Sequence, residues 1–157
     1  SSAASDVYKR QMIDRLYEAS QAGVRIDLIV RGICCLIPGR KYSRNIRVTR
    51  IVDTFLEHAR VWYFGNGGKP KLFLGSPDWM RRNLYRRIEA VTPILDPDLK
   101  RELSDMLSIQ LSDKRKACFV DDHLRNRWKS ARPQKEKVRA QYTFYEYLKS
   151  GELRVES

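Results

Sequence analysis

Two short segments place side chains together that could act on a phosphate group. His58 and Arg60 are separated by one residue, and Ser76 and Asp78 repeat that spacing directly after Gly75. Phosphoryl transfer needs a nucleophile or proton donor, cations that hold the non-bridging oxygens, and small polar donors nearby. An imidazole suits either of the first two roles, because in general it titrates near neutrality. His58 is therefore a candidate nucleophile or acid beside a fixed positive charge.

The spacing is similar to the pattern of the phospholipase D superfamily, His-x-Lys followed by Gly-Ser-x-Asn. In this sequence Arg60 stands in place of the lysine and Asp78 in place of the asparagine. The aspartate that follows in that superfamily has no counterpart here. A phospholipase or nuclease would need the missing lysine, so this alternative requires measurable diesterase activity in its support.

Arginines at two further places suit phosphate oxygens, because a guanidinium presents a fork of N–H donors. Arg31 directly follows the apolar residues of a predicted strand, and open α/β sheets bind ligands at the carboxyl ends of their strands. A second cluster surrounds Asn83 and consists of Arg81, Arg82, Arg86 and Arg87. A solvated helix face would explain this cluster equally well, so Arg82 and Arg87 are candidates for a polyanion-binding surface only.

The charge of the chain predicts a polyanionic partner. Lys and Arg number 31 against 19 Asp and Glu, which leaves a formal net charge of +12 and a pI near 9.9. Nucleic acid, acidic lipid, a phosphate polymer and a nucleotide all fit this charge. Residues 125–139 hold seven cations and one acid, and they form either a solvated loop or a collar for a long anion. Arg127 and Lys129 are its candidate contacts.

Cysteine and the second histidine give weaker signals. Cys34, Cys35 and Cys118 form an odd set with an adjacent pair, which is a poor disulfide framework and has no zinc-type spacing. We interpret Cys34 and Cys35 as space-filling residues of an apolar segment in a reducing compartment. His123, next to two carboxylates, is interpreted as a surface or helix-start residue.

The order of predicted elements is that of an α/β domain. We expect helices at 6–21, 50–58, 97–111 and 135–149, strands at 24–30, 46–48, 60–64, 71–74, 87–91 and 117–120, a loop at 38–44, and a turn or helix start at 78–85. Gly65-Asn66-Gly67-Gly68 gives the strongest turn signal, and Asp96 before Pro97 is a plausible helix cap. We expect residues 1–157 to form one domain, cut from a longer protein because no Met begins it.

Longer motifs run through the chain in a fixed order. They read DLIVRGICCLIPG at 27–39, NIRV at 45–48, FLEHARVWYFGNGG at 55–68, SPDWMRRNLYRRIE at 76–89, TPI at 92–94 and KVRAQ at 137–141. Together these stretches resemble polyphosphate kinase, the enzyme family that makes inorganic polyphosphate from ATP. The resemblance covers residues 7–149, and several long motifs in order are far more specific than any short pattern.

The resemblance implies a phospholipase D-like α/β fold, a mixed sheet flanked by helices, as the last of two such domains in a large multidomain enzyme. It implies reversible transfer of the terminal phosphate of ATP to polyphosphate, with Mg²⁺ and ADP, through a phosphohistidine in a preceding domain that is absent here. His58 would be a second active-site histidine, a proton donor or electrostatic partner, and Arg31 a contact of the nucleotide phosphates. Further nucleotide or phosphate contacts would be Arg60, Ser76, Asp78 and Asn83.

Partners and location follow from the same resemblance. We expect nucleotide, inorganic polyphosphate and the other domains of the same chain as partners, a homo-oligomer at full length, and no specific nucleic acid. We expect a cytoplasmic enzyme, and its positive charge also allows peripheral association with the inner face of the membrane. The rival from another class is a polyanion- or nucleic-acid-binding module without catalysis, although no helix-turn-helix, zinc-finger or RNA-recognition signature supports it.

Four positions depart from the usual pattern of the family. Gly75 stands where a second serine is usual, Pro77 replaces alanine, Tyr85 replaces a commonly acidic residue, and Ala59 replaces a more polar one. These changes concern the loop near the expected phosphates, so they bear on its rigidity and its detailed contacts.

Overall fold

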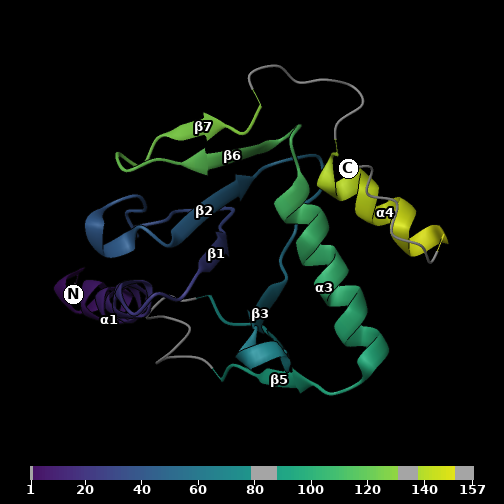
Figure 1. Cartoon of the computed structure of the whole chain (residues 1–157), viewed down its shortest axis with the longest axis horizontal. Coiled ribbons are helices and arrows are strands. Elements are labelled where there is room, and N and C mark those ends of the chain that lie inside the picture. The colour runs from purple at the N-terminus through teal and green to yellow at the C-terminus, as the bar shows by residue number, and fades with distance from the viewer. Residues whose placement is uncertain (1, 79–87, 131–137, 151–157) are drawn as a thin grey trace. The chain divides into compact units, whose positions relative to one another are not determined.

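The computed structural model describes residues 2–78, 88–130 and 138–150. The chain divides into two compact units (Figure 1). We call them the four-stranded unit, Ile13–Phe55 with Met106–Ser157, and the three-stranded unit, Ser1–Met12 with Leu56–Asp105. Each is described by itself, and the expectation of a single domain over 1–157 stays a prediction.

The four-stranded unit is built on a mixed sheet. Its strands are β1 (Ile26–Ile29), β2 (Ile46–Ile51), β6 (Ala117–Val120) and β7 (Asn126–Trp128), and they lie in the order β1-β2-β6-β7. β1 runs parallel to β2, whereas β2–β6 and β6–β7 are antiparallel. The predicted α/β class with a mixed sheet is confirmed.

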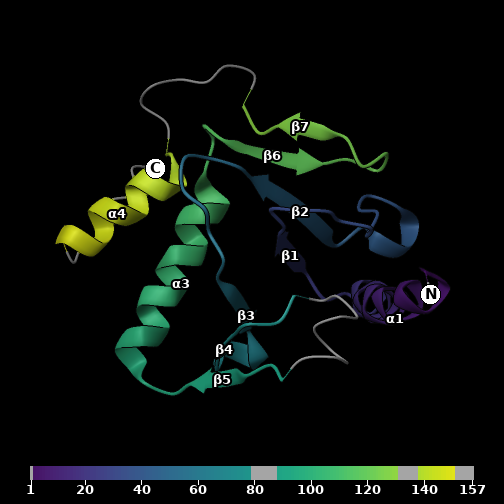
Figure 2. The same ribbon diagram turned by 180° about the vertical axis from the view of Figure 1, so that it is seen from behind.

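Helices cover both faces of this sheet, because successive side chains of a strand point to opposite faces. On one face Ile46 and Val48 of β2 pack with Val120, Leu36 and side chains of α1 (Ser2–Gln21). On the other face Ile51 packs with residues of α3 (Pro97–Ser112) and α4 (Ala140–Ser150); the cluster contains Ile109, Ala117, Ala140 and Phe144. Figure 2 shows the same sheet from behind. The prediction of a sheet flanked by helices is therefore confirmed.

The three-stranded unit contains an antiparallel sheet of β3 (Arg60–Phe64), β4 (Lys71–Gly75) and β5 (Val91–Ile94), in that order. The predicted hairpin between residues 60–64 and 71–74 is confirmed, with Arg60 opposite Gly75 and Phe64 opposite Lys71. Asn66 and Gly67 adopt φ values of 45° and 61° in the connecting turn, η2 (Asn66–Gly68). Asparagine and glycine tolerate this left-handed conformation, which is why the Asn-Gly signal located the turn correctly.

Two carboxylates, exposed Asp96 and buried Asp113, fix helix starts. Asp96 caps α3, because its Oδ1 accepts from the backbone N–H groups of Asp98 and Leu99 at 2.9 Å each, as predicted. Asp113 was not predicted: its side chain is fully buried and accepts four backbone N–H groups, three from residues 115–117 and one from Ala140. It thereby joins the start of β6 to the start of α4.

No helix among residues 2–78, 88–130 and 138–150 is long and apolar enough to cross a bilayer.

Several predicted elements were wrong or misplaced. The helix expected at 50–58 does not form, because β2 continues to Ile51 and the residues from Val52 to the start of β3 have no regular structure. The strand expected at 87–91 lies later, at Val91–Ile94. The last helix begins at Ala140, and the expected start at 135 lies outside the described residues, as does most of 78–85. β7 arises within the basic segment 125–139, for which no strand was expected, and η1 (Lys41–Ser43) arises within the loop at 38–44.

Candidate functional site

His58, Arg60 and Asp78 come together in the three-stranded unit. The guanidinium of Arg60 donates through Nε to Oδ1 of Asp78 at 2.8 Å, and its Nη2 pairs with the same oxygen. The same guanidinium donates through Nη1 to the carbonyl of His58, and Nη2 lies 3.4 Å from Nε2 of the imidazole. Arg60, at the start of β3, therefore joins the His58-x-Arg60 motif to the Ser76-x-Asp78 motif.

This geometry restricts the chemistry of His58. Arginine has donors only, so a hydrogen bond from Arg60 requires the lone pair of Nε2. In the neutral imidazole the proton then lies on Nδ1, which is the atom left to donate. The imidazole is exposed, so a ligand can reach it.

Ser76 has an acidic partner that the sequence did not indicate. Its hydroxyl donates to Oε2 of Glu89, a residue just before β5. Its backbone N–H donates to the carbonyl of Ala90 at 3.2 Å. Ser76 therefore extends the pairing of β4 with β5 and follows Gly75, which packs against the indole of Trp62.

Arg31 lies in the four-stranded unit, immediately beyond β1. β1 ends at Ile29, and Val30 still donates to the carbonyl of Thr49 at 2.9 Å. Arg31 is exposed and makes no hydrogen bond or ion pair with any described residue. This is the predicted placement, at the carboxyl end of a strand that is parallel to its neighbour.

Arg50, near the end of β2, contacts this region and was missed by sequence reasoning because it fell in the expected helix at 50–58. Its Nη2 donates to the carbonyl of Gly32 at 3.1 Å, and its Nη1 donates to Oδ1 of Asn126 at 2.9 Å. Burial raises the pKa of the Cys34 thiol, and the charge of Arg50 opposes that rise. Cys35, in contrast, is exposed, so the interpretation that it fills space in the interior was wrong.

The residues just before His58 in the chain are held by the beginning of α4. Asp53, whose side chain is 2% exposed, accepts two hydrogen bonds from Arg139, at 2.8 and 2.6 Å. Hydrogen bonding to Arg139 lowers the pKa of Asp53, although burial opposes the shift. Gln141 binds the backbone of Phe55 on both sides, accepting from its N–H and donating to its carbonyl at 2.8 Å each. The KVRAQ motif therefore has a structural role, which the sequence did not reveal.

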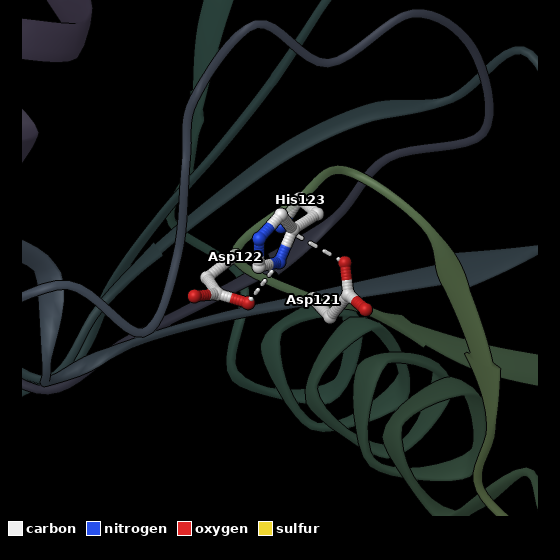
Figure 3. Close-up of side chains that lie close together, drawn as sticks. All are labelled: Asp121, Asp122 and His123. Atoms are coloured by element: carbon white, nitrogen blue, oxygen red, sulfur yellow. Dashed lines mark hydrogen bonds and ion pairs between the residues drawn. The ribbon is translucent and has the colours of Figure 1, made fainter.

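Asp121, Asp122 and His123 cluster at the turn between β6 and β7 (Figure 3). Their side chains are already occupied. Asp121 accepts from the backbone N–H groups of His123 and Arg125 and from the side chains of Arg125 and Arg127. Desolvation raises the pKa of this carboxyl, but these four hydrogen bonds outweigh it and hold the pKa well below its usual range. Nδ1 of His123 lies 2.8 Å from Oδ1 of Asp122. Figure 3 marks this contact with a dashed line. The cluster therefore stabilises a turn, in agreement with a surface position for His123.

Of the candidates for a polyanion surface, the structure describes Arg127 and Lys129. Arg127 pairs with Asp121 at 2.9 Å but is 61% exposed. Lys129 donates to the carbonyl of Leu111 at 2.8 Å and lies over the ring of Phe119, and burial lowers its pKa. Asn83, Arg82 and Arg87 lie outside the described residues, so their roles stay predictions.

Comparison with known proteins settles the family. Residues 4–141 match the family model described as polyphosphate kinase C-terminal domain 2. The chain belongs to the polyphosphate kinase family. Polyphosphate kinase from Escherichia coli K12 is 48% identical over 149 residues, which are 94% of this chain and 22% of that protein. The enzyme from a Synechocystis strain is 58% identical over 108 residues, 68% of this chain and 15% of that protein.

A solved structure supports the same conclusion. The crystal structure of polyphosphate kinase from Porphyromonas gingivalis superposes with a TM-score of 0.85 at 57% identity, covering 90% of this chain and 22% of that chain. The resemblance predicted from the motifs is thus confirmed, together with the bacterial character of the relatives. The chain spans about a fifth of the length of these polyphosphate kinases.

Proposed function

We propose that this chain is the C-terminal catalytic part of a polyphosphate kinase, which reversibly transfers the terminal phosphate of ATP to inorganic polyphosphate. The phosphohistidine of that reaction would be carried by a part of the enzyme that this chain lacks. The observation that carries the proposal is Arg31: an exposed guanidinium without a described partner, at the carboxyl end of a parallel strand, within a family-type motif. A fixed cation without an intramolecular partner is suited to an anionic ligand such as a nucleotide phosphate.

His58 would act in proton transfer or as an electrostatic partner of the transferred phosphate. Its Nε2 faces Arg60 at 3.4 Å, so Nδ1–H is the donor that remains for a phosphate oxygen or for the leaving ADP. The carboxylate of Asp78 accepts from two nitrogens of the Arg60 guanidinium and thereby fixes its orientation. Within this proposal Arg60 and Asp78 orient the imidazole, while a direct phosphate contact of Arg60 would need a rearranged ion pair.

Magnesium would have to be bound largely by groups outside the described residues. Mg²⁺ prefers a set of oxygen ligands in octahedral geometry. The described chain brings three metal-type side chains together only at Asp121, Asp122 and His123, and these already hold N–H donors and arginines. Asp78 is engaged by Arg60. The described residues therefore supply no ready-made cluster of protein ligands for magnesium, and we derive no step through the ion.

The experiment uses the full-length kinase that carries this chain and measures polyphosphate synthesis from radiolabelled ATP. Arg31→Ala should weaken nucleotide phosphate binding by about 1.5–3 kcal/mol, which is roughly a 10- to 150-fold rise in KM for ATP. The matched control is Arg25→Ala, an exposed arginine at the amino end of the same strand, which pairs with Asp27. Equal KM values for the wild type and Arg31→Ala would remove Arg31 from the site.

His58→Ala in the same enzyme should abolish most synthesis while the circular dichroism spectrum stays native. Near-normal turnover of that variant would contradict the assignment of His58. The isolated chain is expected to bind nucleotide or polyphosphate weakly and to turn nothing over, because half of the site would be missing.

The proposed partners are nucleotide, polyphosphate and the remaining domains of the kinase, with a homo-oligomer at full length. The proposed location is the cytoplasm, with peripheral association at the inner membrane face as an alternative. A salt titration separates this proposal from a general nucleic-acid-binding module, because both polyanions lose affinity as salt rises. Polyphosphate binding at physiological salt that double-stranded DNA does not match supports the kinase. Equal or tighter DNA binding, unaffected by Arg31→Ala, supports the module.

A further inference from the structure

Arg50 connects three segments at the end of the four-stranded sheet. It belongs to β2, its Nη2 donates to Gly32 in the segment that follows β1, and its Nη1 donates to Asn126 in β7. Asn126 is two strands away from β2 in the sheet, so the guanidinium bridges across β6. Nε of Arg50 is buried and meets no hydrogen-bond partner among the described residues. An unsatisfied buried donor costs free energy, so the two hydrogen bonds of Nη1 and Nη2 are made at some cost to stability.

The residues around the peptide that Arg50 binds have little other restraint. Arg31, Gly32 and Ile33 are exposed and belong to no helix or strand, whereas Leu36 further along the chain is anchored in the core. A Cβ built on Gly32 would meet no atom within 4 Å, so packing does not confine the backbone there. Glycine also gives the unrestrained backbone more conformations than any other residue. The hydrogen bond from Arg50 to the carbonyl of Gly32 therefore limits the freedom of the peptide that follows Arg31.

Restraint of this kind favours ligand binding. A flexible segment loses conformational entropy when it closes on a ligand, and that loss reduces affinity. A segment fixed before binding avoids the loss. The guanidinium of Arg50 contacts Gly32, the residue that follows Arg31. Arg50 therefore also adds a positive charge to this loop.

We propose that Arg50 is a positioning residue for Arg31, and that it presets the Arg31–Gly32 backbone for a nucleotide phosphate. The inference rests on the proposed function, in which Arg31 contacts the nucleotide. Arg50 itself touches Gly32 and Asn126 and acts on the ligand through Arg31. Its loss therefore weakens ATP binding much more than it slows the chemical step.

The test measures KM for ATP and kcat in the full-length kinase carrying this chain. Arg50→Gln is expected to raise KM about tenfold and to leave kcat within about twofold. Arg50→Lys keeps the charge and one donor, so it should restore part of the affinity. The matched control is Arg47→Gln: Arg47 lies on the same strand but on the opposite face, where it is exposed and contacts Asp27 and Phe119. Its KM is expected to stay within about twofold of the wild type.

The double variant Arg31→Ala with Arg50→Gln separates positioning from general charge. If Arg50 acts through Arg31, the second substitution should change KM less than about twofold once Arg31 is absent. If Arg50→Gln raises KM for ATP equally in the wild type and in Arg31→Ala, the inference is overturned. It is also overturned if Arg47→Gln raises KM as much as Arg50→Gln does. A wild-type KM for Arg50→Gln would overturn it as well.

The outcomes also distinguish the two proposals. If Arg31→Ala raises KM and neither Arg50 variant does, the positioning role fails while the proposed function stands. If Arg31→Ala changes nothing, Arg31 is not a nucleotide contact, and both the assignment and the role of Arg50 are refuted. Thermal unfolding of each variant is measured alongside, and Arg50→Lys replaces Arg50→Gln if the latter does not fold.

Discussion

Replacing Gly75 by alanine tests how tightly the three-stranded sheet is packed near the second motif. A Cβ at this position would lie 2.9 Å from the backbone oxygen of Ala90 and 2.9 Å from Cζ3 of Trp62. Non-bonded heavy atoms of this kind normally lie ~3.5–4.0 Å apart. The carbonyl of Ala90 also accepts the N–H of Ser76, so it cannot move without disturbing the pairing of β4 with β5. The added methyl group therefore has no free space.

The two opposing contributions to stability can be compared. Overpacking of a well-packed site costs about 1–3 kcal/mol. Removing a glycine from a strand restores roughly 0.5–1 kcal/mol, because the unfolded chain loses conformational freedom. We therefore expect Gly75→Ala to reduce the free energy of unfolding by about 1–2 kcal/mol.

Urea unfolding of the purified chain, followed by circular dichroism, measures this loss. Gly65→Ala is the matched control, because Gly65 lies in the same unit with φ near −63° and has no atom within 4 Å of a built Cβ. Its unfolding free energy should stay within about 0.5 kcal/mol of the wild type. In a Trp62→Phe background the smaller ring vacates part of the space, so Gly75→Ala should cost less there. Equal stability of Gly75→Ala and Gly65→Ala would refute the reasoning.

The same contact bears on the serine that the family resemblance led us to expect at the position of Gly75. A serine side chain would begin with the Cβ that Trp62 and Ala90 exclude in this structure. The large indole and the small glycine are therefore a matched pair in this protein. Replacing only one of them leaves either a clash or a gap next to Ser76.

Three further predictions concern stability and reactivity. Asp113→Ala removes the acceptor of four backbone N–H groups, two in buried and two in part-buried hydrogen bonds, so the same urea assay should show a loss of about 3–5 kcal/mol. A loss below about 1 kcal/mol would mean that water replaces the carboxylate. Arg139 lowers the pKa of Asp53, so the stability that this pair provides is present above about pH 4 and is lost as the pH falls through the lowered pKa. Melting temperatures should therefore fall on acidification below about pH 4, and Asp53→Asn, already deprived of that stability, should show less of this fall. Iodoacetamide should label exposed Cys35 before Cys118, which is 7% exposed and whose pKa burial raises; equal labelling rates by mass spectrometry would contradict the burial.

Local signals in the sequence predicted the elements that depend on local physics. The hairpin at β3 and β4 follows from Asn66-Gly67, which tolerates positive φ, and the start of α3 follows from Asp96 as a cap. β6 was predicted with the correct bounds from its apolar residues. The family followed from long motifs, which carry far more information than any single spacing.

Elements that depend on distant partners were predicted less well. The segment expected to be a helix at 50–58 has suitable apolar spacing, but β2 continues to Ile51 because β1 and β6 pair with it on both sides. β5 was displaced in the prediction because it contains Pro93, which a sheet accepts on an edge strand such as this one. β7 was missed because a three-residue edge strand of Asn, Arg and Trp is too short to show apolar alternation.

The candidate site shows the same division. Residue types identified His58, Arg60, Ser76 and Asp78 as a group, and the structure joins three of them through Arg60. Spacing alone did not show that Arg60 would be paired with Asp78, since eighteen residues separate them. Glu89 and Arg50 were missed because their partners lie far away in the chain and no local pattern marks them.

Hydrogen bonds tie Asp53 to Arg139 and Phe55 to Gln141, and this affects how the chain folds while it is synthesised on the ribosome. Each of these contacts joins residues 86 positions apart. At a synthesis rate of about 5–20 residues per second, the segment leading to β3 waits roughly 4–17 s for its partners. During that time β1 and β2 can pair, but exposed Phe55 and the charged Asp53 have nothing to bind. Until the start of α4 has emerged, the nascent chain offers this segment to chaperones and proteases.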